Sequence, residues 1–242
     1  MELTRAGELL RNSALTFKHD EIYLMRMLQD TAKNTRNFAF GATLSVAEFM
    51  LPPDLERLIC AYPQSHIRME VGNTRELLSK LDAGELDFAV VEGEFPREEY
   101  EFLLYRKEPY VPVASRKKAE QYRNAEFREL LSERLILREP GSGTREILER
   151  ELRRRGMTTD DFSQITELGN IGAIQAMLRA NLGISFFYQA TLTDRETQLA
   201  PIELKDFSLE HEVMFIFRKN SSFREDYEEI YAFLTNRENS QN

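Results

Sequence analysis

The sequence predicts an α/β fold in which two doubly wound β-α-β-α-β units follow a long N-terminal helix. Residues 3–35 carry a helical apolar pattern with no strand signal beside it. Two nearly continuous apolar runs, Leu86–Gly93 and Ile184–Tyr188, are typical of parallel strands that are buried on both faces. Helical patterns with capping residues alternate with these and other strand signals along the chain. A parallel sheet covered by helices requires that alternation.

The N-terminal helix is expected to run from Leu3 to about Thr35, with Thr4 as its N-cap. Its apolar residues recur at close to the 3.5-residue spacing of a coiled-coil seam, at Leu10, Ala14, Phe17, Leu24 and Leu28. One interpretation is an amphipathic helix packed on the core of its own chain. The alternative, which its unusual length favours, is a linker helix that pairs with another subunit. Residues 1–36 are therefore predicted to form a linker and dimerisation segment.

The first predicted unit follows this helix. Ser45 and Glu48 match a capping box, which places the start of its first helix at Ser45. Asn73 and Glu76 give a second capping signal. The expected elements are strand Asn37–Gly41, a helix kinked at Pro52 that ends near Tyr62, strand His66–Gly72, a helix that ends near Gly84, strand Leu86–Gly93, and strands within Phe102–Ser115.

The second predicted unit has the same plan and follows a polar helical stretch, Lys117–Ser132. Its expected elements are strand Leu135–Leu137, helix Thr144–Arg155, strand Gln164–Leu168, a helix capped by Asn170, strand Ile184–Tyr188 and a late strand, Leu199–Leu204. A last strand over Val213–Arg218, a closing helix over Phe223–Leu234 and a disordered tail are expected to complete the chain. The predicted division is residues 37–115 with 205–242 as subdomain I, and residues 116–204 as subdomain II.

Composition limits the classes of partner and the compartment. The formal net charge of −9 makes this chain a poor nonspecific ligand for nucleic acid or for an anionic membrane. The single cysteine, Cys60, excludes an internal disulfide framework and is expected to be a buried thiol in an apolar helical pattern. The N-terminus has no signal-peptide pattern, and no run of about 18 apolar residues is present to span a bilayer. A cytoplasmic protein is expected.

A glycine turn joins a buried strand to a helix within Leu135–Glu146, which reads LILREPGSGTRE. Helix starts carry unpaired backbone N–H groups and a partial positive charge, so they suit a carboxylate, a sulfate or a phosphate. Ser142 and Thr144 add two hydroxyl groups at this helix start. The turn is therefore a candidate anion site.

Side chains that follow strands of both units are expected to line one cleft, because ligands of open α/β sheets sit beyond the carboxyl ends of the strands. The predicted binding residues are Thr43, Leu44, Ser45, Glu92, Glu139, Gly141, Ser142, Gly143, Thr144, Asn170 and Ile171. The alternative is that Ser45, Ser142 and Asn170 only cap their helices, which contributes about 1 kcal/mol per cap. One cap does not require two hydroxyls and two glycines, so the GSGT turn is the strongest candidate.

Two arginines flank this turn. Arg145 lies in the first helical turn, where a cation opposes the helix macrodipole. It is expected either to pair with Glu139 or Glu149 or to meet an anionic ligand. Arg138, on the preceding strand, is expected to form a structural ion pair.

Catalytic and metal-binding interpretations find little support in the sequence. The three histidines, His19, His66 and His211, lack metal-ligand spacing and are expected to be ordinary core or surface residues. HExxH, CxxC and GxSxG are absent, and GSGT lacks the lysine of a P-loop. Glu92 and Glu139 could face each other as an acid–base pair, but no nucleophile or metal set accompanies them. We therefore expect that the chain is not an enzyme and that it needs no cofactor or metal.

The order of these motifs resembles that of LysR-type transcriptional regulators, in their linker helix and effector-binding domain. The family's LTxAG stretch, which opens the linker helix, is similar to ELTRAGELL at this N-terminus. The most specific likeness is GNTRELLSKLDAGELDFAVVEG, Gly72–Gly93, and the second half of the effector domain is matched by REPGSGTR and LGNIGAIQAMLRANLGISFF. The REPGSGTR stretch looks most like regulators of sulfur and cysteine metabolism and of carbon fixation. The resemblance covers nearly the whole chain.

The resemblance implies two Rossmann-like subdomains of the type II periplasmic-binding-protein kind, with a small anionic effector in the cleft between them. It carries the effector-binding role over to Thr43–Ser45, to Ser142–Thr144, and to Asn170 and Ile171. It also implies a homodimer or homotetramer that controls transcription. The family's N-terminal winged helix-turn-helix has no counterpart among these 242 residues, so DNA contact is expected only through a domain absent from this chain.

Two other classes of protein use the same kind of fold. A solute-binding protein that delivers a small anion to a transporter is the alternative function, although the missing signal peptide and the long N-terminal helix favour a regulator. An enzyme is disfavoured, because the sequence shows no nucleophile, metal set or catalytic cysteine at the expected cleft.

Overall fold

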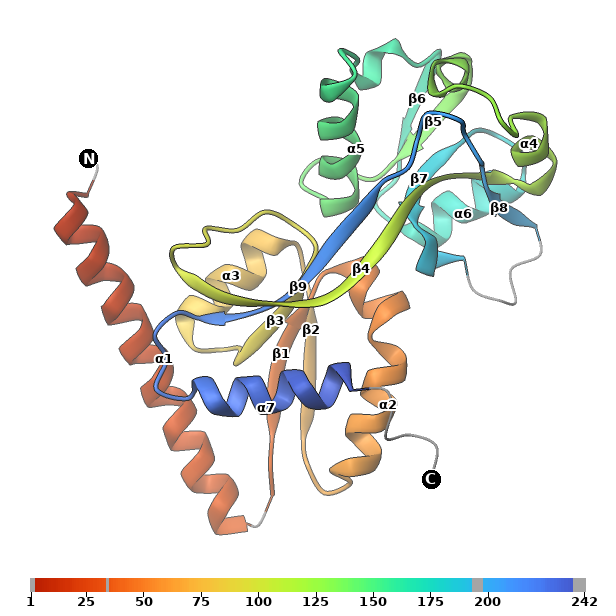
Figure 1. Ribbon diagram of the computed structural model, residues 1–242. Coiled ribbons are helices and arrows are strands. Elements are labelled where there is room, and N and C mark those ends of the chain that lie inside the picture. Colours follow the sequence, from red (N-terminus) through yellow and green to blue (C-terminus); the bar gives the residue numbers. More distant parts are fainter. Residues whose placement is uncertain (1–2, 34, 193–197, 237–242) are drawn as a thin grey trace. The chain divides into compact units, whose positions relative to one another are not determined.

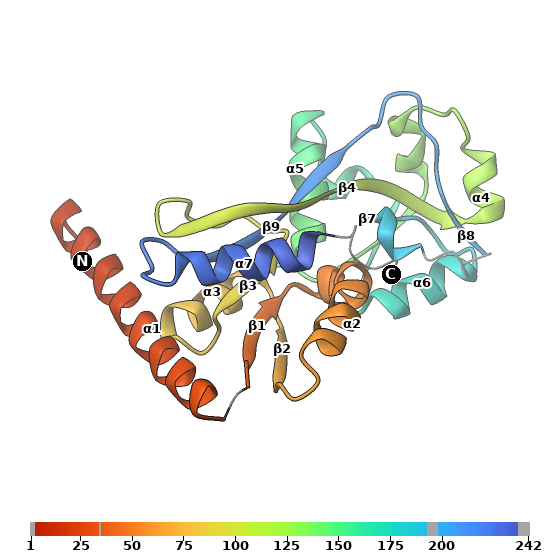
Figure 2. The same cartoon turned by 60° about the horizontal axis from the view of Figure 1, so that its bottom comes forward.

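The computed structural model describes residues 3–33, 35–192 and 198–236, so the predicted disordered tail lies, from residue 237 on, outside the described residues. The chain forms two compact units, and Figures 1 and 2 draw both as ribbons coloured along the sequence. Unit 1 comprises Met1–Arg106 and Val213–Asn242, and unit 2 comprises Lys107–Glu212. Unit 1 is therefore assembled from both ends of the chain. None of the helices in the described ranges is long and apolar enough to cross a lipid bilayer.

Unit 1 is built on a sheet with the strand order β2-β1-β3-β9-β4. Its elements are α1 (Arg5–Lys33), β1 (Phe38–Ala42), the π-helical turn η1 (Val46–Met50), α2 (Pro52–Ala61), β2 (Ile67–Val71), α3 (Thr74–Ala83), β3 (Phe88–Val91), the first part of β4 (Tyr100–Ser115), the last part of β9 (Glu210–Arg218) and α7 (Arg224–Thr235). β1 pairs in parallel with β2 and β3, and β3 pairs antiparallel with β9. The predicted β-α-β-α-β unit is confirmed, and β1 and β3 are buried along their whole length.

Aromatic rings hold the centre of this sheet together. Phe40 on β1, Phe88 on β3 and Phe215 on β9 stack in a row, with ring centroids 4.9 Å and 4.6 Å apart. All three rings are fully buried, and such aromatic pairs contribute about 0.5–1.5 kcal/mol beyond their buried area. Both ribbon views show α3 beside α1 and α7 beside α2 around the strands of this unit. The packing fixes the carboxyl ends of β1 and β3, which the predicted ligand residues follow.

Unit 2 repeats the plan. Its elements are the remaining parts of β4 and β9 together with α4 (Arg116–Gln121), the 3-10 helix η2 (Phe127–Ser132), β5 (Arg134–Leu137), α5 (Gly143–Arg154), η3 (Thr159–Asp161), β6 (Gln164–Glu167), α6 (Ile171–Arg179), β7 (Ser185–Tyr188), η4 (Gln189–Thr191) and β8 (Leu199–Pro201). β5 pairs in parallel with β6 and, through a bridge between Leu135 and Ile184, with the segment that leads into β7. β4 pairs antiparallel with β7 and β8. The second predicted β-α-β-α-β unit is thus confirmed.

Three local predictions were wrong. The helical stretch expected over Lys117–Ser132 is instead the short α4, a turn and η2, because Asn124 adopts a left-handed φ of 60° that a right-handed helix does not contain. The strands expected within Phe102–Ser115 form the single strand β4. Cys60 is exposed, because α2 turns Leu58 towards the core and Cys60, two residues further on, lies on the opposite side of the helix.

α1 turns polar side chains inwards and apolar side chains outwards. Its N-cap is confirmed, since Thr4 Oγ1 accepts a hydrogen bond from Gly7 N at 3.1 Å. The predicted seam residues Leu10, Phe17 and Leu24 are 72%, 72% and 45% exposed. The residues that α1 buries are Thr16, His19, Asp20, Tyr23 and Asp30. The predicted seam therefore faces away from the core of unit 1, while the opposite face of α1, with Tyr23, packs on that unit.

Specific polar contacts hold α1 on unit 1. Asp20 accepts hydrogen bonds from Ser221 Oγ at 2.6 Å and from Ser222 N at 2.7 Å. Further along the helix, Arg26 donates to the buried carboxylate of Asp87. A polar contact surface of this kind fixes the orientation of α1 and leaves its apolar seam on the outside.

Candidate functional site

The carboxyl ends of β1 and β3 bring together the predicted site residues of unit 1. The two strands lie side by side in parallel, so Thr43 and Glu92 leave the sheet at the same edge. Thr43, Ser45 and Glu92 are buried, and Leu44 is half-buried. These four residues therefore form one half of the predicted site within unit 1.

Ser45 does not cap the helix that follows it, so the predicted capping box is wrong. The residue has helical backbone angles, φ −62° and ψ −37°, and its side chain accepts no capping hydrogen bond from any described residue. An N-cap side chain normally reaches the helix from an extended backbone. The chain instead enters the π-helical turn η1, in which Leu51 N donates to Val46 O at 2.9 Å. Such π turns are rare and occur frequently at functional sites.

The hydroxyl groups of Thr43 and Ser45 are buried and have no hydrogen-bond partner within the described part of the chain. The backbone of Thr43, by contrast, is bonded on both sides: its N–H donates to Val90 O at 3.2 Å, and its carbonyl accepts from Ala47 N at 2.9 Å. A buried polar group left without a partner costs about 1–3 kcal/mol. Two such hydroxyls lie at one helix start, and the described residues supply a partner to neither of them.

In unit 2 the GSGT turn leads from β5 into α5. Gly141 has a left-handed φ of 87°, which glycine adopts without strain, and Ser142 N donates to Glu139 O at 3.3 Å to close the turn. The hydroxyls of Ser142 and Thr144 are buried and lie 3.0 Å apart, in hydrogen-bond contact with each other. Ser142 makes no side-chain capping bond in the described chain. Since α5 begins at Gly143, the backbone N–H groups of its first turn lack partners inside the helix.

Tyr110 on β4 supports this turn, and the sequence analysis missed it. Its hydroxyl donates to Thr144 O at 2.7 Å. The ring is 1% exposed and packs against Phe186 and Tyr188, with centroids 6.3 Å and 5.7 Å apart. The apolar residues around Tyr110 mark it as inward-facing, but the carbonyl that it meets depends on the pairing of β4 with β7, which no local pattern reveals.

The two arginines beside the turn are bound to carboxylates of unit 2, which confirms the ion pair predicted for Arg138 and, of the two possibilities for Arg145, the pair with Glu149. Arg138 forms a bidentate pair with Glu139, in which Nε and Nη2 each donate over 2.7 Å. Arg145 donates to Glu149 at 2.7 Å and to Glu167 at 2.8 Å. Burial raises the pKa of Glu139, but hydrogen bonds from Arg138 outweigh burial and hold that pKa below its ordinary value. An ionised Glu139 bound by an arginine is a poor general acid.

Asn170 caps α6, as the sequence predicted. Its side chain accepts a hydrogen bond from Ala173 N at 2.9 Å, and Ile171 behind it is fully buried. β6 lies parallel to β5, and a Cβ added to Gly169 would come within 3.6 Å of Glu139 Oε2. Unit 2 therefore gathers Glu139, the GSGT turn and Asn170 at one edge of its sheet, and ligand contact by Asn170 and Ile171 stays a prediction.

The fold is of the periplasmic-binding-protein-like class, with a long helix in front of it. Residues 32–238 match the LysR substrate binding domain family. The chain belongs to this family, and it is an effector-binding domain of the LysR type.

Curated relatives and solved structures agree with this assignment. The HTH-type transcriptional regulator CysL of Bacillus subtilis is 25% identical over 204 residues, which make up 81% of this chain and 64% of that protein. The probable RuBisCO transcriptional regulator of Cyanidium caldarium is 25% identical over 214 residues, 82% of this chain and 64% of that protein. The chain thus spans 64% of the length of both relatives. The CcmR regulatory domain of Synechocystis PCC6803 in complex with 2-PG shares the fold, with a TM-score of 0.71, 22% identity and coverage of 84% of this chain and 99% of that chain.

Proposed function

We propose that this chain is the ligand-sensing part of a LysR-type transcriptional regulator, with a small anionic metabolite as its effector and no catalytic role. The observation that carries the proposal is the state of the hydroxyls at the two helix starts. Within the described chain, Thr43 and Ser45 have no hydrogen-bond partner, and Ser142 and Thr144 bond each other rather than capping α5. Hydroxyls and unpaired N–H groups at a helix start are donors that suit carboxylate, sulfate or phosphate oxygens.

One effector is proposed to accept hydrogen bonds from Thr43 and Ser45 of unit 1 and from Ser142 and Thr144 of unit 2. The remaining predicted contacts are Leu44, Glu92, Glu139, Gly141, Gly143, Asn170 and Ile171. The chain passes between the units within β4 and within β9, so an anion that binds residues of both would favour one arrangement of the units. Differential affinity for that arrangement lets an effector bias a regulator, and a coupling of about 1–3 kcal/mol suffices. The 2-PG in the CcmR complex supports an anionic effector.

The exposed seam of α1 is proposed to pair with a second copy of the chain. Leu10, Phe17 and Leu24 lie seven residues apart on the outer face, and Leu28, one turn further on, is 57% exposed. Apolar residues in heptad spacing that stay in water are characteristic of a helix lacking its partner helix. The molar masses of the chain and of its Phe17→Asp variant, measured by light scattering, test this pairing. A monomeric mass for both would contradict it.

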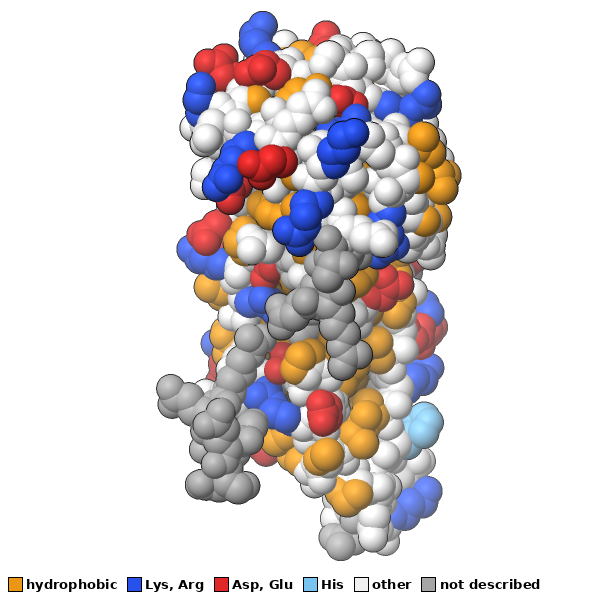
Figure 3. Space-filling view, turned by 90° about the vertical axis from the view of Figure 1, so that its right-hand side faces the viewer, with side chains coloured by type: hydrophobic (Ala, Val, Ile, Leu, Met, Phe, Trp, Pro, Cys, Tyr) orange, Lys and Arg blue, Asp and Glu red, His pale blue; other side chains and the backbone are white. Residues whose placement is uncertain are grey.

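DNA recognition is proposed to belong to a part of the regulator outside these 242 residues. The net charge of the chain is −9, and basic and acidic side chains are interspersed with apolar ones on the face drawn in Figure 3. Such a surface offers little to a polyanion. We place the regulator in the cytoplasm, where a lone exposed thiol such as Cys60 stays reduced.

Isothermal titration of the chain with sulfate, O-acetylserine and 2-phosphoglycolate tests the effector site, and Ser45→Ala is the key variant. Removing a hydroxyl that binds an anion is expected to weaken binding about tenfold or more. The same substitution should leave the free energy of unfolding unchanged or raise it, because the hydroxyl has no partner among the described residues. Thr235→Ala is the control for affinity, since that hydroxyl bonds Tyr231 O within α7.

Asn170→Ala provides the contrast in stability. The Asn170 side chain caps α6, so its loss is expected to lower the free energy of unfolding by about 1 kcal/mol. If Ser45→Ala behaves like Asn170→Ala in unfolding and leaves every measured anion affinity unchanged, Ser45 is a structural residue and the proposed site is wrong.

A further inference from the structure

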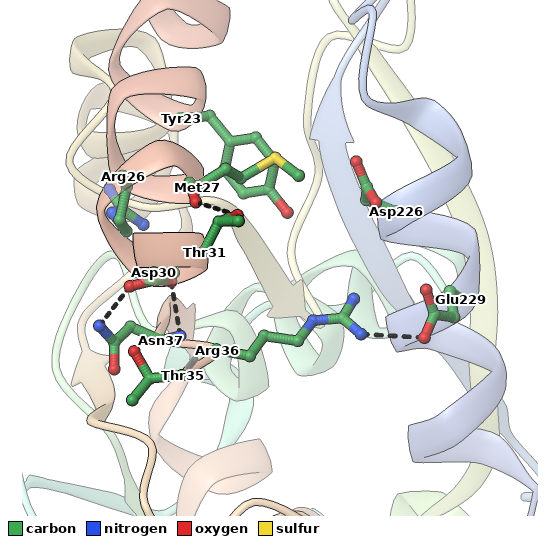
Figure 4. Close-up of a pocket in the computed structure, with 10 residues that line it drawn as sticks. All are labelled: Tyr23, Arg26, Met27, Asp30, Thr31, Thr35, Arg36, Asn37, Asp226 and Glu229. Atoms are coloured by element: carbon green, nitrogen blue, oxygen red, sulfur yellow. Dashed lines mark hydrogen bonds and ion pairs between the residues drawn. The ribbon is translucent and has the colours of Figure 1, made fainter. Parts of the chain in front are cut away.

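A cavity of about 270 Å³, partly open to solvent, lies between α1 and α7 in unit 1, and Figure 4 shows it in close-up. Its walls are the last turns of α1, the loop Thr35–Asn37 and the first two turns of α7. The proposed effector residues are not among those that line it. The cavity is therefore a separate feature of the molecule, and any function of its own is independent of the effector proposal.

Tyr23 on α1 points its hydroxyl into this cavity (Figure 4). The residue is 8% exposed, and its ring packs against Phe223 and Tyr227 with centroids 4.9 Å and 5.2 Å apart. The hydroxyl has no hydrogen-bond partner in the described part of the chain, although the hydroxyl of a buried tyrosine usually finds one. Burial raises the pKa of Tyr23, so the hydroxyl is neutral and can accept a hydrogen bond.

The carboxylates of the cavity wall differ in their hydrogen bonds: those of Glu229 and Asp30 are bonded within the wall, and that of Asp226 is not. Arg36 Nη1 donates to Glu229 Oε1 at 2.9 Å, and Asp30 accepts from N and Nδ2 of Asn37 at 2.8 Å and 2.6 Å. Asp226 lies on α7 opposite Tyr23 and accepts no hydrogen bond from the described residues (Figure 4). Its interaction with Arg36 is a longer-range one, and burial leaves its pKa above the ordinary value.

The charge of the wall favours a cation. Arg26 pairs with Asp87, outside the lining, and Arg36 pairs with Glu229, so the carboxylates of Asp30 and Asp226 leave the wall with a net negative charge. Metal coordination is a poor match, because the described residues contain no group of three or more His, Cys, Asp or Glu placed to hold a metal ion. An organic cation needs only one carboxylate and neighbouring hydrogen-bond acceptors.

We propose that this cavity binds a small organic cation, an ammonium or guanidinium group on a short carbon chain. Asp226 pairs with the charge, the Tyr23 hydroxyl accepts a hydrogen bond from it, and Met27 packs against the carbon chain. A volume of about 270 Å³ equals that of about nine water molecules, which is enough for such a ligand. Because the walls belong to α1 and α7, a bound cation ties the last turns of α1 to the body of unit 1.

Titration of the full chain by NMR tests this site with four probes of one length: butylammonium, butylguanidinium, butyrate and butanol. Saturable binding is expected for the two cations and not for butyrate or butanol. Asp226→Asn is expected to weaken cation binding about tenfold or more, and Tyr23→Phe, which keeps the packed ring, about fivefold. Hydrogen exchange in the last turns of α1 should slow when the cation is bound.

The matched control is Glu225→Gln. Glu225 is exposed, precedes Asp226 in the same turn of α7 and does not line the cavity, so its variant loses the same charge at the same helix start. Cation affinity is expected to stay unchanged in this variant. Butyrate binding as strong as cation binding, equal affinities in the Asp226→Asn and Glu225→Gln variants, or no saturable binding of either cation would each overturn the proposal.

Discussion

The helix starts of units 1 and 2 are alike in composition but differ in what their hydroxyls contact. Each follows a buried strand and carries two hydroxyls two residues apart, Thr43 and Ser45 in unit 1, Ser142 and Thr144 in unit 2. The unit 2 hydroxyls bond each other, and Tyr110 supports their turn. The unit 1 hydroxyls are buried with no partner among the described residues. The difference teaches that the turn of unit 2 is ordered by contacts within its own unit, whereas the two hydroxyls of unit 1 receive no such contacts from the described residues.

The largest expected effect comes from removing one hydroxyl in each unit. Ser45→Ala and Thr144→Ala are each expected to weaken anion binding about tenfold or more, since hydrogen bonds to charged groups contribute about 1.5–3 kcal/mol. If one anion contacts both units, the double variant should lose less than the product of the two single losses, because either substitution already removes part of the bridging. Isothermal titration measures both affinity and stoichiometry. Two bound anions, each sensitive to one variant alone, would show two separate sites and contradict the shared effector.

A smaller effect is expected from Tyr110→Phe, which affects unit 2 alone. The variant keeps the ring between Phe186 and Tyr188 but removes the hydrogen bond to Thr144 O, a loss of about 1 kcal/mol in the free energy of unfolding. Urea denaturation measures this change. The control is Tyr231→Phe, which removes an exposed hydrogen bond to Leu104 O and is expected to cost less.

Anion affinity should also fall in the Tyr110→Phe variant, because the turn that carries Thr144 loses the hydrogen bond that orders it. If stability and affinity both equal those of the unsubstituted chain, the unit 2 turn is not ordered by Tyr110, and the contrast between the two units weakens.

The sequence predicted the parts of the fold that depend on local patterns. Buried strands appear as continuous apolar runs, and both β-α-β-α-β units follow from them. The caps at Asn73 and Asn170 were also predictable, because a cap involves residues within one turn of each other. The Ser45 capping motif failed, since the chain enters a π-helical turn there and the motif carries no signal for that geometry.

Features that depend on distant partners were not predictable. The heptad seam of α1 was visible in the sequence, but the polar contacts of Arg26 and Asp20 that hold α1 are made with Asp87 and Ser221, far away along the chain. The hydrogen bond from Tyr110 to the GSGT turn likewise could not be predicted, because it depends on the register in which β4 pairs with β7. In both cases single polar contacts decide the arrangement, and hydrophobic periodicity does not encode them.

The smallest expected effect is a pH dependence of stability that unit 2 has through its Arg138–Glu139 pair. In Glu139 burial raises the pKa, but hydrogen bonds from Arg138 outweigh it, so the folded chain has the lower pKa. The unfolded chain therefore binds the proton at higher pH, and the contribution of this pair to stability is complete above the ordinary carboxyl pKa. That contribution is lost as the pH falls through the lowered value. The side chain of Glu139 is 45% exposed, so solvent screens the pair and keeps the effect small.

Hydrogen exchange of α5 amides between about pH 5 and pH 3 measures this loss, with α2 of unit 1 as the internal reference. Glu139→Gln should flatten the pH dependence of α5, because the titrating partner of Arg138 is gone. Glu146→Gln, an exposed carboxylate on the first turn of α5, should leave it as it is. An equal slope in both variants would assign the pH dependence to the general charge of unit 2, and the ordering of the GSGT turn would then rest on Tyr110 rather than on the Arg138–Glu139 pair.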